Sequence, residues 1–243
     1  MTYCVGLRLA NGLIFMSDTR TNAGVDNIST FKKMYTWQVP GDRFIMMMTA
    51  GNLATTQTVI SILEEHTKAA SEREPSILKA PSMFQVATLV GKTLRQVIMD
   101  ATAEGQKAES TFNATMIVGG QIANGETRMF LVYPEGNFIE ASADTPFFQI
   151  GETKYGRPIL VRAYDPDMSM ETATKLLLVS FDSTIKANLS VNLPLDMVTY
   201  ENGSLKQGFT TRFEPDDKYY QMVSSNWGEA LRSAFNSLDD PQF

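Results

Sequence analysis

Short apolar runs alternate with turn residues over roughly the first fifty positions of the chain. Asn11-Gly12 separates two such runs, and Pro40-Gly41-Asp42 separates two more. Asn-Gly between apolar runs favours a hairpin turn, and Pro, Gly and Asp are typical of tight turns. The pattern therefore predicts two antiparallel hairpins, with strands over residues 2–9, 13–18, 31–39 and 43–50 and a loop over residues 19–30.

The spacing of the apolar residues changes from that of a strand to that of a helix at about residue 52. Leu53, Val59, Ile60 and Leu63 lie on one face of a helix, and a similar pattern begins at Met83. A polar, proline-containing stretch of ordinary loop length separates the two patterns. We therefore predict helices over residues 52–70 and 83–102, joined by a connection over residues 71–81.

The second half of the chain repeats this order of strands and then helices, with Glu201-Asn202-Gly203 as a further hairpin turn. The predicted elements are strands over residues 111–122, 127–133, 137–140, 195–200 and 204–213, and helices over residues 153–163, 169–188 and 217–238. Antiparallel sheets that each carry helices on one face can pack their other faces together. Because no linker divides the chain, we predict a single α+β domain over residues 1–243, a four-layer αββα sandwich.

Charge and hydropathy restrict the possible partners. The 243 residues include 27 acidic and 21 basic side chains, which gives a formal net charge of −6. Binding to nucleic acid or to an anionic membrane requires a concentrated basic face, and the sequence has no such cluster. No stretch approaches the roughly 18 apolar residues of a membrane span, and the first residues lack a basic signal segment. We expect a cytoplasmic protein with no nucleic-acid or membrane partner.

The chain contains one cysteine, Cys4, and one histidine, His66. These are too few for a zinc site of the usual Cys/His type, and we expect no metal and no cofactor. Ser-His-Asp and Cys-His nucleophile systems would both have to use His66. We interpret Cys4 as a buried structural thiol and His66 as a solvated helix residue. An enzyme made from this chain must therefore activate its nucleophile without histidine.

Thr2 is a candidate for such a nucleophile, because removal of Met1 would leave a threonine with a free α-amine. An α-amine titrates near ~7.7–8.0, so it is partly neutral at working pH and can accept the hydroxyl proton. The charge of Lys33 would lower the proton affinity of both groups, and Asp18 would hold Lys33 in an ion pair. A backbone N–H at Gly51, where a helix begins, would stabilise the oxyanion of a tetrahedral intermediate.

Five segments carry a resemblance to a known family: TYCVG (2–6), SDTRTNAGVD (17–26), ISTFKKM (28–34), TAGNLA (49–54) and IGETKYGRPIL (150–160). The chain resembles the proteasome β-subunit superfamily of N-terminal nucleophile hydrolases and, within it, the bacterial proteasome-like family called Anbu. The resemblance extends through the whole chain and is most specific over roughly the first 60 residues. It implies the αββα sandwich that is typical of N-terminal nucleophile hydrolases.

The resemblance implies Thr2 as the nucleophile with its own amine as the base, Asp18 and Lys33 as a supporting pair, and Gly51 as the oxyanion donor. Lys32 competes with Lys33 for the role of the lysine. We prefer Lys33, because an apolar residue follows it directly in the family pattern. In addition, neighbouring residues of a strand point to opposite faces, so only one of the two lysines can reach the site.

The resemblance also implies the substrate contacts. Thr21 and Asn22 would present their backbone to an extended substrate. The pocket for the residue before the scissile bond would be lined by Phe31, Thr49 and Leu53.

The chain departs from the proteasome pattern in two places. Proteasome β-subunits have a serine near the amine of the nucleophile, where this chain has Glu152. A carboxylate at this position would raise the pKa of the Thr2 amine and weaken it as a base. Further along, Asp182 and Thr184 are candidate counterparts of an aspartate and a serine that contact the nucleophile region in proteasomes.

Three functions remain open. The first is a threonine hydrolase that cleaves a peptide or amide bond through an acyl-enzyme on Thr2. The second is a self-assembling scaffold or binding shell with weak or no hydrolysis, which Glu152 favours, and the third is a hydrolase of small non-peptide amides. The resemblance further implies a homo-oligomeric ring or open helical turn, a peptide-like substrate, and ATP-grasp and transglutaminase-like proteins as partners.

Overall fold

Two antiparallel sheets form the centre of the computed structural model, which describes residues 2–22, 28–68, 76–103 and 112–243. The first sheet has the order β10-β1-β2-β11-β12 and the second has the order β5-β6-β7-β8-β9. The first sheet consists of β1 (Tyr3–Leu9), β2 (Gly12–Asp18), β10 (Phe147–Gly151), β11 (Leu195–Glu201) and β12 (Thr210–Phe213). The second consists of β5 (Met34–Val39), β6 (Arg43–Gly51), β7 (Ala114–Ile122), β8 (Arg128–Val132) and β9 (Phe138–Glu140).

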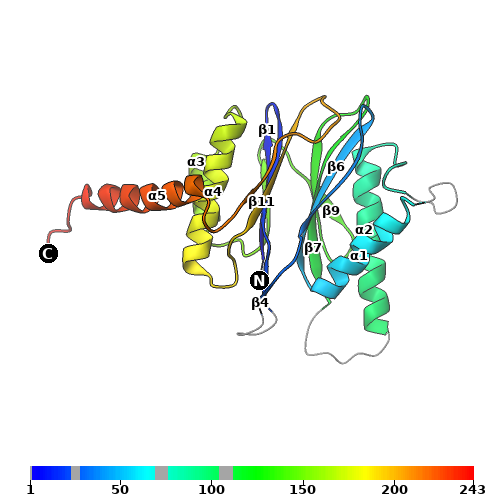
Figure 1. Ribbon diagram of the computed structural model, residues 1–243, viewed down its shortest axis with the longest axis horizontal. Helices are drawn as coiled ribbons and strands as arrows, with labels where there is room; N and C mark the ends of the chain where they lie inside the picture. Colours follow the sequence, from blue (N-terminus) through cyan, green and yellow to red (C-terminus); the bar gives the residue numbers. More distant parts are fainter. Residues whose placement is uncertain (1, 23–27, 69–75, 104–111) are drawn as a thin grey trace.

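Helices cover the outer faces of both sheets, as Figure 1 shows. The helices α1 (Leu53–Glu65) and α2 (Met83–Ala103) pack on the second sheet, and α3 (Arg157–Ala163) and α4 (Met170–Ala187) lie beside the first. The predicted four-layer αββα sandwich is therefore confirmed. Within the described residues no helix is both long enough and apolar enough to cross a membrane.

The alternation of β1 shows how the sequence builds these layers, because successive side chains of a strand point to opposite faces. Tyr3, Val5 and Leu7 are buried in the apolar cluster that the first sheet forms with α4. Cys4 is buried in a different cluster, which lies between the two sheets. By the same alternation Thr2 belongs to the face of β1 that is turned toward the second sheet.

Several predicted boundaries are wrong. Strand β10 was not predicted, and the hairpin of β3 (Arg20–Asn22) and β4 (Ile28–Thr30) lies within the stretch predicted to be a loop. Residues 31–33 are not part of a strand, because the backbone N–H of Phe31 donates to the Thr19 carbonyl outside either sheet. The predicted helix over 153–163 and the predicted strand over 204–213 are both shorter, beginning at Arg157 and Thr210.

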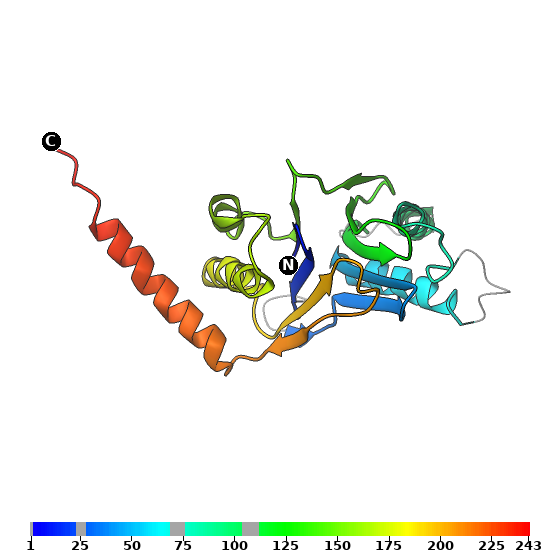
Figure 2. The ribbon, with the colours of Figure 1, turned by 90° about the horizontal axis from the view of Figure 1, so that it is seen from above.

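The last helix, α5 (Lys218–Asn236), leaves the body of the molecule at an angle, which Figures 1 and 2 show from two directions. Its first turns are anchored, because Tyr220 and Val223 are buried against the cluster of the first sheet and α4. Every residue from Glu229 onward is exposed. The far half of α5 therefore projects from the body of the molecule with exposed side chains.

Candidate active site

Thr2 is held at the start of β1 by the end of β10. The backbone N–H of Glu152 donates to the Thr2 carbonyl oxygen over 2.6 Å. Gly151 makes this approach possible, because it has a φ of +82° and a Cβ there would lie 1.9 Å from the Thr2 oxygen. A positive φ favours glycine, and there is no room for a side chain at this position. The main chain of Thr2 is therefore fixed, whereas its side chain is half-buried.

Asp18 and Lys33 form a buried ion pair directly behind the start of β1. Lys33 Nζ donates to Asp18 Oδ1 over 2.8 Å, and the Tyr3 backbone N–H donates to the same oxygen over 2.9 Å. Lys33 Nζ also donates to the Arg20 carbonyl over 2.5 Å. The predicted lysine and aspartate are thus brought together one residue from Thr2. Lys32 instead is exposed, with its Nζ 5.2 Å from the centre of the Tyr35 ring.

Burial dominates the electrostatics of the pair. It raises the pKa of Asp18 to about 6, and the charge of Lys33 and the Tyr3 N–H oppose the shift. Asp18 is therefore ionised at neutral pH, where it pairs with the lysine. Asp18 Oδ2 is buried and has no hydrogen-bond partner within the part of the chain that the structure describes.

Cys4 is buried, as predicted, and does not compete with Thr2 as a nucleophile. Its Sγ donates to the Thr49 carbonyl over 3.7 Å, which joins the two sheets. Burial and the charge of Asp18 both raise the pKa of the Cys4 thiol above its usual range. The sulfur therefore stays protonated at neutral pH, and a thiolate is the reactive form of cysteine.

Gly51 lies where β6 ends and α1 begins. Its φ is +117°, and a Cβ there would lie 2.5 Å from the Asn113 carbonyl oxygen. The next residue, Asn52, caps α1 by accepting a hydrogen bond from the Thr55 N–H over 3.1 Å. This turn exposes Gly51 at the N-terminal end of a helix, where the helix dipole favours negative charge.

The residues predicted to contact substrate fall on three neighbouring segments. Thr21 and Asn22 lie in β3, directly after Arg20, the first residue of this strand, whose carbonyl accepts from Lys33. Phe31 is half-buried after β4, and Thr49 is buried in β6 with its N–H bonded to the Lys33 carbonyl over 3.0 Å. Leu53, half-buried, is the first residue of α1.

Glu152 and Asn188 form a pair that the sequence did not reveal. Glu152 is buried, and its Oε2 accepts from Asn188 Nδ2 over 2.9 Å while its Oε1 accepts from the Lys154 N–H over 3.1 Å. Asn188 is the C-cap of α4. The two residues are 36 positions apart. The one sequence signal was that Asn188, a polar amide, is the last residue of the helix predicted over 169–188.

Asp182 and Thr184 take their contacts elsewhere. Asp182 Oδ1 accepts from the Tyr220 hydroxyl of α5 over 3.3 Å, and Thr184 Oγ1 donates to the Ser180 carbonyl over 2.9 Å within α4. The structure thus brings Asn188, and not these two hydroxyl and carboxyl groups, to Glu152.

A hydrogen-bonded chain behind Thr2 was also missed. Burial raises the pKa of Tyr3 to about 12, so its hydroxyl is protonated. Gln149 Nε2 donates to this hydroxyl over 2.6 Å, and Ser180 Oγ donates to the Gly156 carbonyl over 3.1 Å. The Tyr3 proton is then free to complete the 2.8 Å bond to Ser180 Oγ. Tyr3, the neighbour of Thr2, is therefore anchored to α4.

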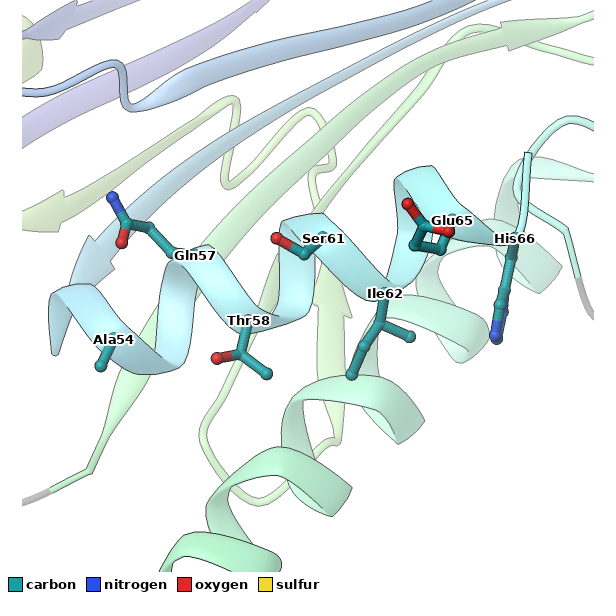
Figure 3. A pocket seen from close by; sticks show the side chains of 7 residues that line it. All are labelled: Ala54, Gln57, Thr58, Ser61, Ile62, Glu65 and His66. Atoms are coloured by element: carbon teal, nitrogen blue, oxygen red, sulfur yellow. The ribbon is translucent and has the colours of Figure 1, made fainter. Parts of the chain in front are cut away.

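One surface depression lies away from these residues. It measures about 630 Å³ and is lined by Ala54, Gln57, Thr58, Ser61, Ile62, Glu65 and His66. Figure 3 shows that all seven residues come from α1 and its C-cap, so the depression follows one helix rather than a cleft between elements. Among the described residues no three His, Cys, Asp or Glu side chains are grouped as a metal site would require.

Comparisons with known proteins agree with this geometry. The family model described as "Proteasome subunit" matches residues 2–198. Proteasome subunit beta 2 of Pyrobaculum calidifontis is 24% identical over 205 residues, which cover 84% of this chain and 90% of that protein.

Solved Anbu structures are more similar. Anbu from Yersinia bercovieri is 43% identical with a TM-score of 0.92, and 100% of each chain is covered. A helical assembly of the Anbu complex from Pseudomonas aeruginosa is 43% identical with a TM-score of 0.91, covering 99% of this chain and 98% of that one. The family match and this full-length similarity place the chain: it belongs to the Anbu family within the proteasome subunit family.

Proposed function

We propose that the chain is an N-terminal threonine hydrolase that cleaves a peptide or amide bond through an acyl-enzyme on Thr2. The observation that carries the proposal is the buried Lys33–Asp18 pair, which is bonded to the main chain of Tyr3, the residue after Thr2. Burying an ionised carboxylate and a lysine together lowers the free energy of unfolding unless their attraction offsets it, because desolvation penalises both charges. Its place one residue from a hydroxyl supports a catalytic role.

The proposed chemistry needs Met1 to be removed. The Thr2 Oγ1 attacks the substrate carbonyl carbon, and its proton passes to the freed α-amine. The oxyanion of the tetrahedral intermediate faces the N–H at Gly51, and Lys33 supplies a fixed positive charge near the forming C–O bond. The C–N bond then breaks as the ammonium gives its proton to the leaving nitrogen.

Water completes the cycle. It attacks the ester carbonyl as the α-amine takes one of its protons, and the C–O bond to Thr2 breaks. The proton returns to Oγ1, which restores the enzyme. The hairpin of β3 and β4 is joined to the pair through the Arg20 carbonyl, and the half-buried Thr21 next to it would offer backbone groups to an extended chain, which favours a peptide as substrate over a small amide.

The test is intact-protein mass spectrometry before and after treatment with a peptide epoxyketone. This reagent forms a ring adduct only with a hydroxyl beside a free α-amine, so it tests nucleophile and base together. We expect loss of Met1 and one adduct on Thr2. The adduct should be absent in Lys33→Met and retained in the matched control Lys32→Met, whose side chain is exposed. Mature protein that stays unmodified by several peptide epoxyketones would contradict the proposal.

Glu152 favours a second candidate function, an assembly subunit with weak or no hydrolysis. Its backbone N–H touches the Thr2 carbonyl, and a carboxylate near the freed amine would hold that amine protonated. If Thr2 reacts only in Glu152→Gln, the native chain is this weak form.

Self-association is the second part of the proposal. The Anbu protein of Pseudomonas aeruginosa forms a helical assembly, and this chain is 43% identical to it over nearly its full length. We expect the purified chain to form a homo-oligomer, measured as its mass by light scattering. An assembly would restrict access to Thr2 and so select extended substrates.

A further inference from the structure

The exposed half of α5 continues an apolar stripe that begins inside the protein. Tyr220 and Val223 are buried against α4, whereas Leu231, Phe235 and Leu238 are 49%, 74% and 70% exposed. Spacings of three, four and eight residues keep these side chains along one side of the helix, because eight residues are close to two whole turns. Figure 2 shows that α5 runs on past the body of the molecule, and its exposed apolar side chains continue the stripe that anchors its first turns.

A groove opens beside the anchored half of the same helix. It measures about 600 Å³ and lies between α4 and α5. Its walls include Lys186 from α4 and Trp227, Leu231 and Arg232 from α5. Asp182 also lines it, and this carboxylate already accepts from the Tyr220 hydroxyl. The groove thus offers apolar walls and two cationic side chains.

The protein carries its own match for this groove. The end of α5 combines the apolar Phe235 and Leu238 with the exposed acidic residues Asp239 and Asp240. This end cannot fold back into the groove of its own chain, because α5 is one continuous helix from Lys218 to Asn236. A second copy of the chain can supply it.

We propose that two copies associate through antiparallel packing of their α5 helices, each inserting its Phe235 and Leu238 into the groove between α4 and α5 of the other. This rests on the proposed self-association and assigns it a surface. The contact is isologous, so every pairing occurs twice. With Phe235 opposite Trp227 of the partner subunit, the two-fold axis passes Leu231, which lies midway between these positions.

Charge supports the antiparallel direction. Asp239 and Asp240 then approach the groove that Lys186 lines, and Arg232 lies near Glu229 of the partner subunit across the axis. A parallel pair would instead place the acidic ends side by side, which like-charge repulsion disfavours.

Cysteine cross-linking tests the register. The one native cysteine of the chain is buried, so introduced thiols react without interference. Leu231→Cys should give a disulfide-linked dimer under mild oxidation, because the axis brings two copies of residue 231 together. Ser233→Cys, on the opposite side of the helix and also exposed, is the matched control and should stay unlinked. Equal cross-linking of both variants would overturn the proposed register.

Solution mass tests the surface. Phe235→Asp should raise the dimer dissociation constant at least tenfold in light scattering or sedimentation. Phe209→Asp, which changes a phenylalanine of similar exposure outside α5, should leave the mass unchanged. Asp240→Lys should weaken the dimer, and Lys186→Glu in the same chain should restore it.

The outcomes separate this proposal from the proposed function. An oligomer that keeps its mass in Phe235→Asp would overturn the α5 contact and leave self-association intact. A wild-type chain that is monomeric at every concentration would overturn both. The epoxyketone adduct on Thr2 is measured independently, so neither result decides the hydrolase chemistry.

Discussion

Asn188 at the end of α4 donates its Nδ2 to Glu152 Oε2 over 2.9 Å, while the backbone N–H of Glu152 donates to the Thr2 carbonyl. The two contacts join the C-terminal end of α4 to the residue that precedes β1. The position of the Glu152 carboxylate relative to the main chain of Thr2 is therefore set by an amide side chain far away in sequence.

This relationship predicts opposite pH effects for two substitutions. Asn188→Ala removes a donor from the carboxylate, so its charge acts more strongly on the Thr2 amine. The pH midpoint of epoxyketone adduct formation should rise, by on the order of one unit. Glu152→Gln removes the charge and should lower the midpoint. The pH dependence of the adduct rate measures both, and shifts in the same direction would contradict a charge effect.

Lys33→Met should destabilise the fold as well as abolish the adduct. It leaves the Asp18 carboxylate buried without its counter-charge, which costs about 3 kcal/mol of unfolding free energy. Asp18→Asn in the same chain removes the charge and should recover much of this loss without restoring the adduct. Urea unfolding measures the difference, with Lys32→Met expected within about 0.5 kcal/mol of the wild type.

The raised pKa of Asp18 predicts how stability depends on pH. The pKa is about 6 in the folded protein against an ordinary value of 3.8, so between these values the folded state binds a proton that the unfolded state lacks. This group therefore stabilises the fold more as pH falls from 7 toward 4, by up to about 3 kcal/mol.

Urea unfolding of the wild type and of Asp18→Asn at several pH values isolates this contribution. The difference in unfolding free energy should move in favour of the wild type as pH falls through 6. The reverse slope would mean that Lys33 outweighs burial and holds the pKa of Asp18 below its ordinary value.

Gly151→Ala should be far more damaging than Gly203→Ala. Both glycines have a positive φ, +82° and +77°, and so share the strain of a left-handed residue, about 1 kcal/mol. Only at Gly151 does the new Cβ collide with the chain, 1.9 Å from the Thr2 oxygen; at Gly203 nothing lies within 4 Å. We expect Gly151→Ala to cost about 3 kcal/mol in urea unfolding and to slow the adduct. Equal costs would contradict the tight grip on Thr2.

The sequence predicted the layers of the fold better than the bounds of the individual strands and helices. Asn-Gly turns and long amphipathic helices are local signals, and the sandwich follows from them. Strand β10 has five residues after a polar stretch, and its identity as a strand depends on pairing with β1, from Tyr3 to Leu7. The two strands are far apart in sequence, so the pattern of neighbouring residues does not predict their pairing.

In the candidate site, too, contacts between residues near each other in sequence were predicted and contacts between distant residues were missed. An aspartate at a strand end and a nearby lysine are 15 residues apart, and their opposite charges predicted the pair. Asn188 and Glu152 meet only because α4 ends where β10 ends, which depends on how the helix packs on the sheet. The Ser180 contact of Tyr3 spans 177 positions and has the same origin.

The buried thiol of Cys4 can report local opening of the native state. Cys4 lies two residues from Thr2, and its sulfur, in one sheet, donates to the carbonyl of Thr49 in the other. A thiol reagent can react there only when the two sheets part at this edge, so its rate measures how often the native state opens beside Thr2. Slower labelling with a bound peptide would locate that peptide at this end of the sandwich, whatever its sequence.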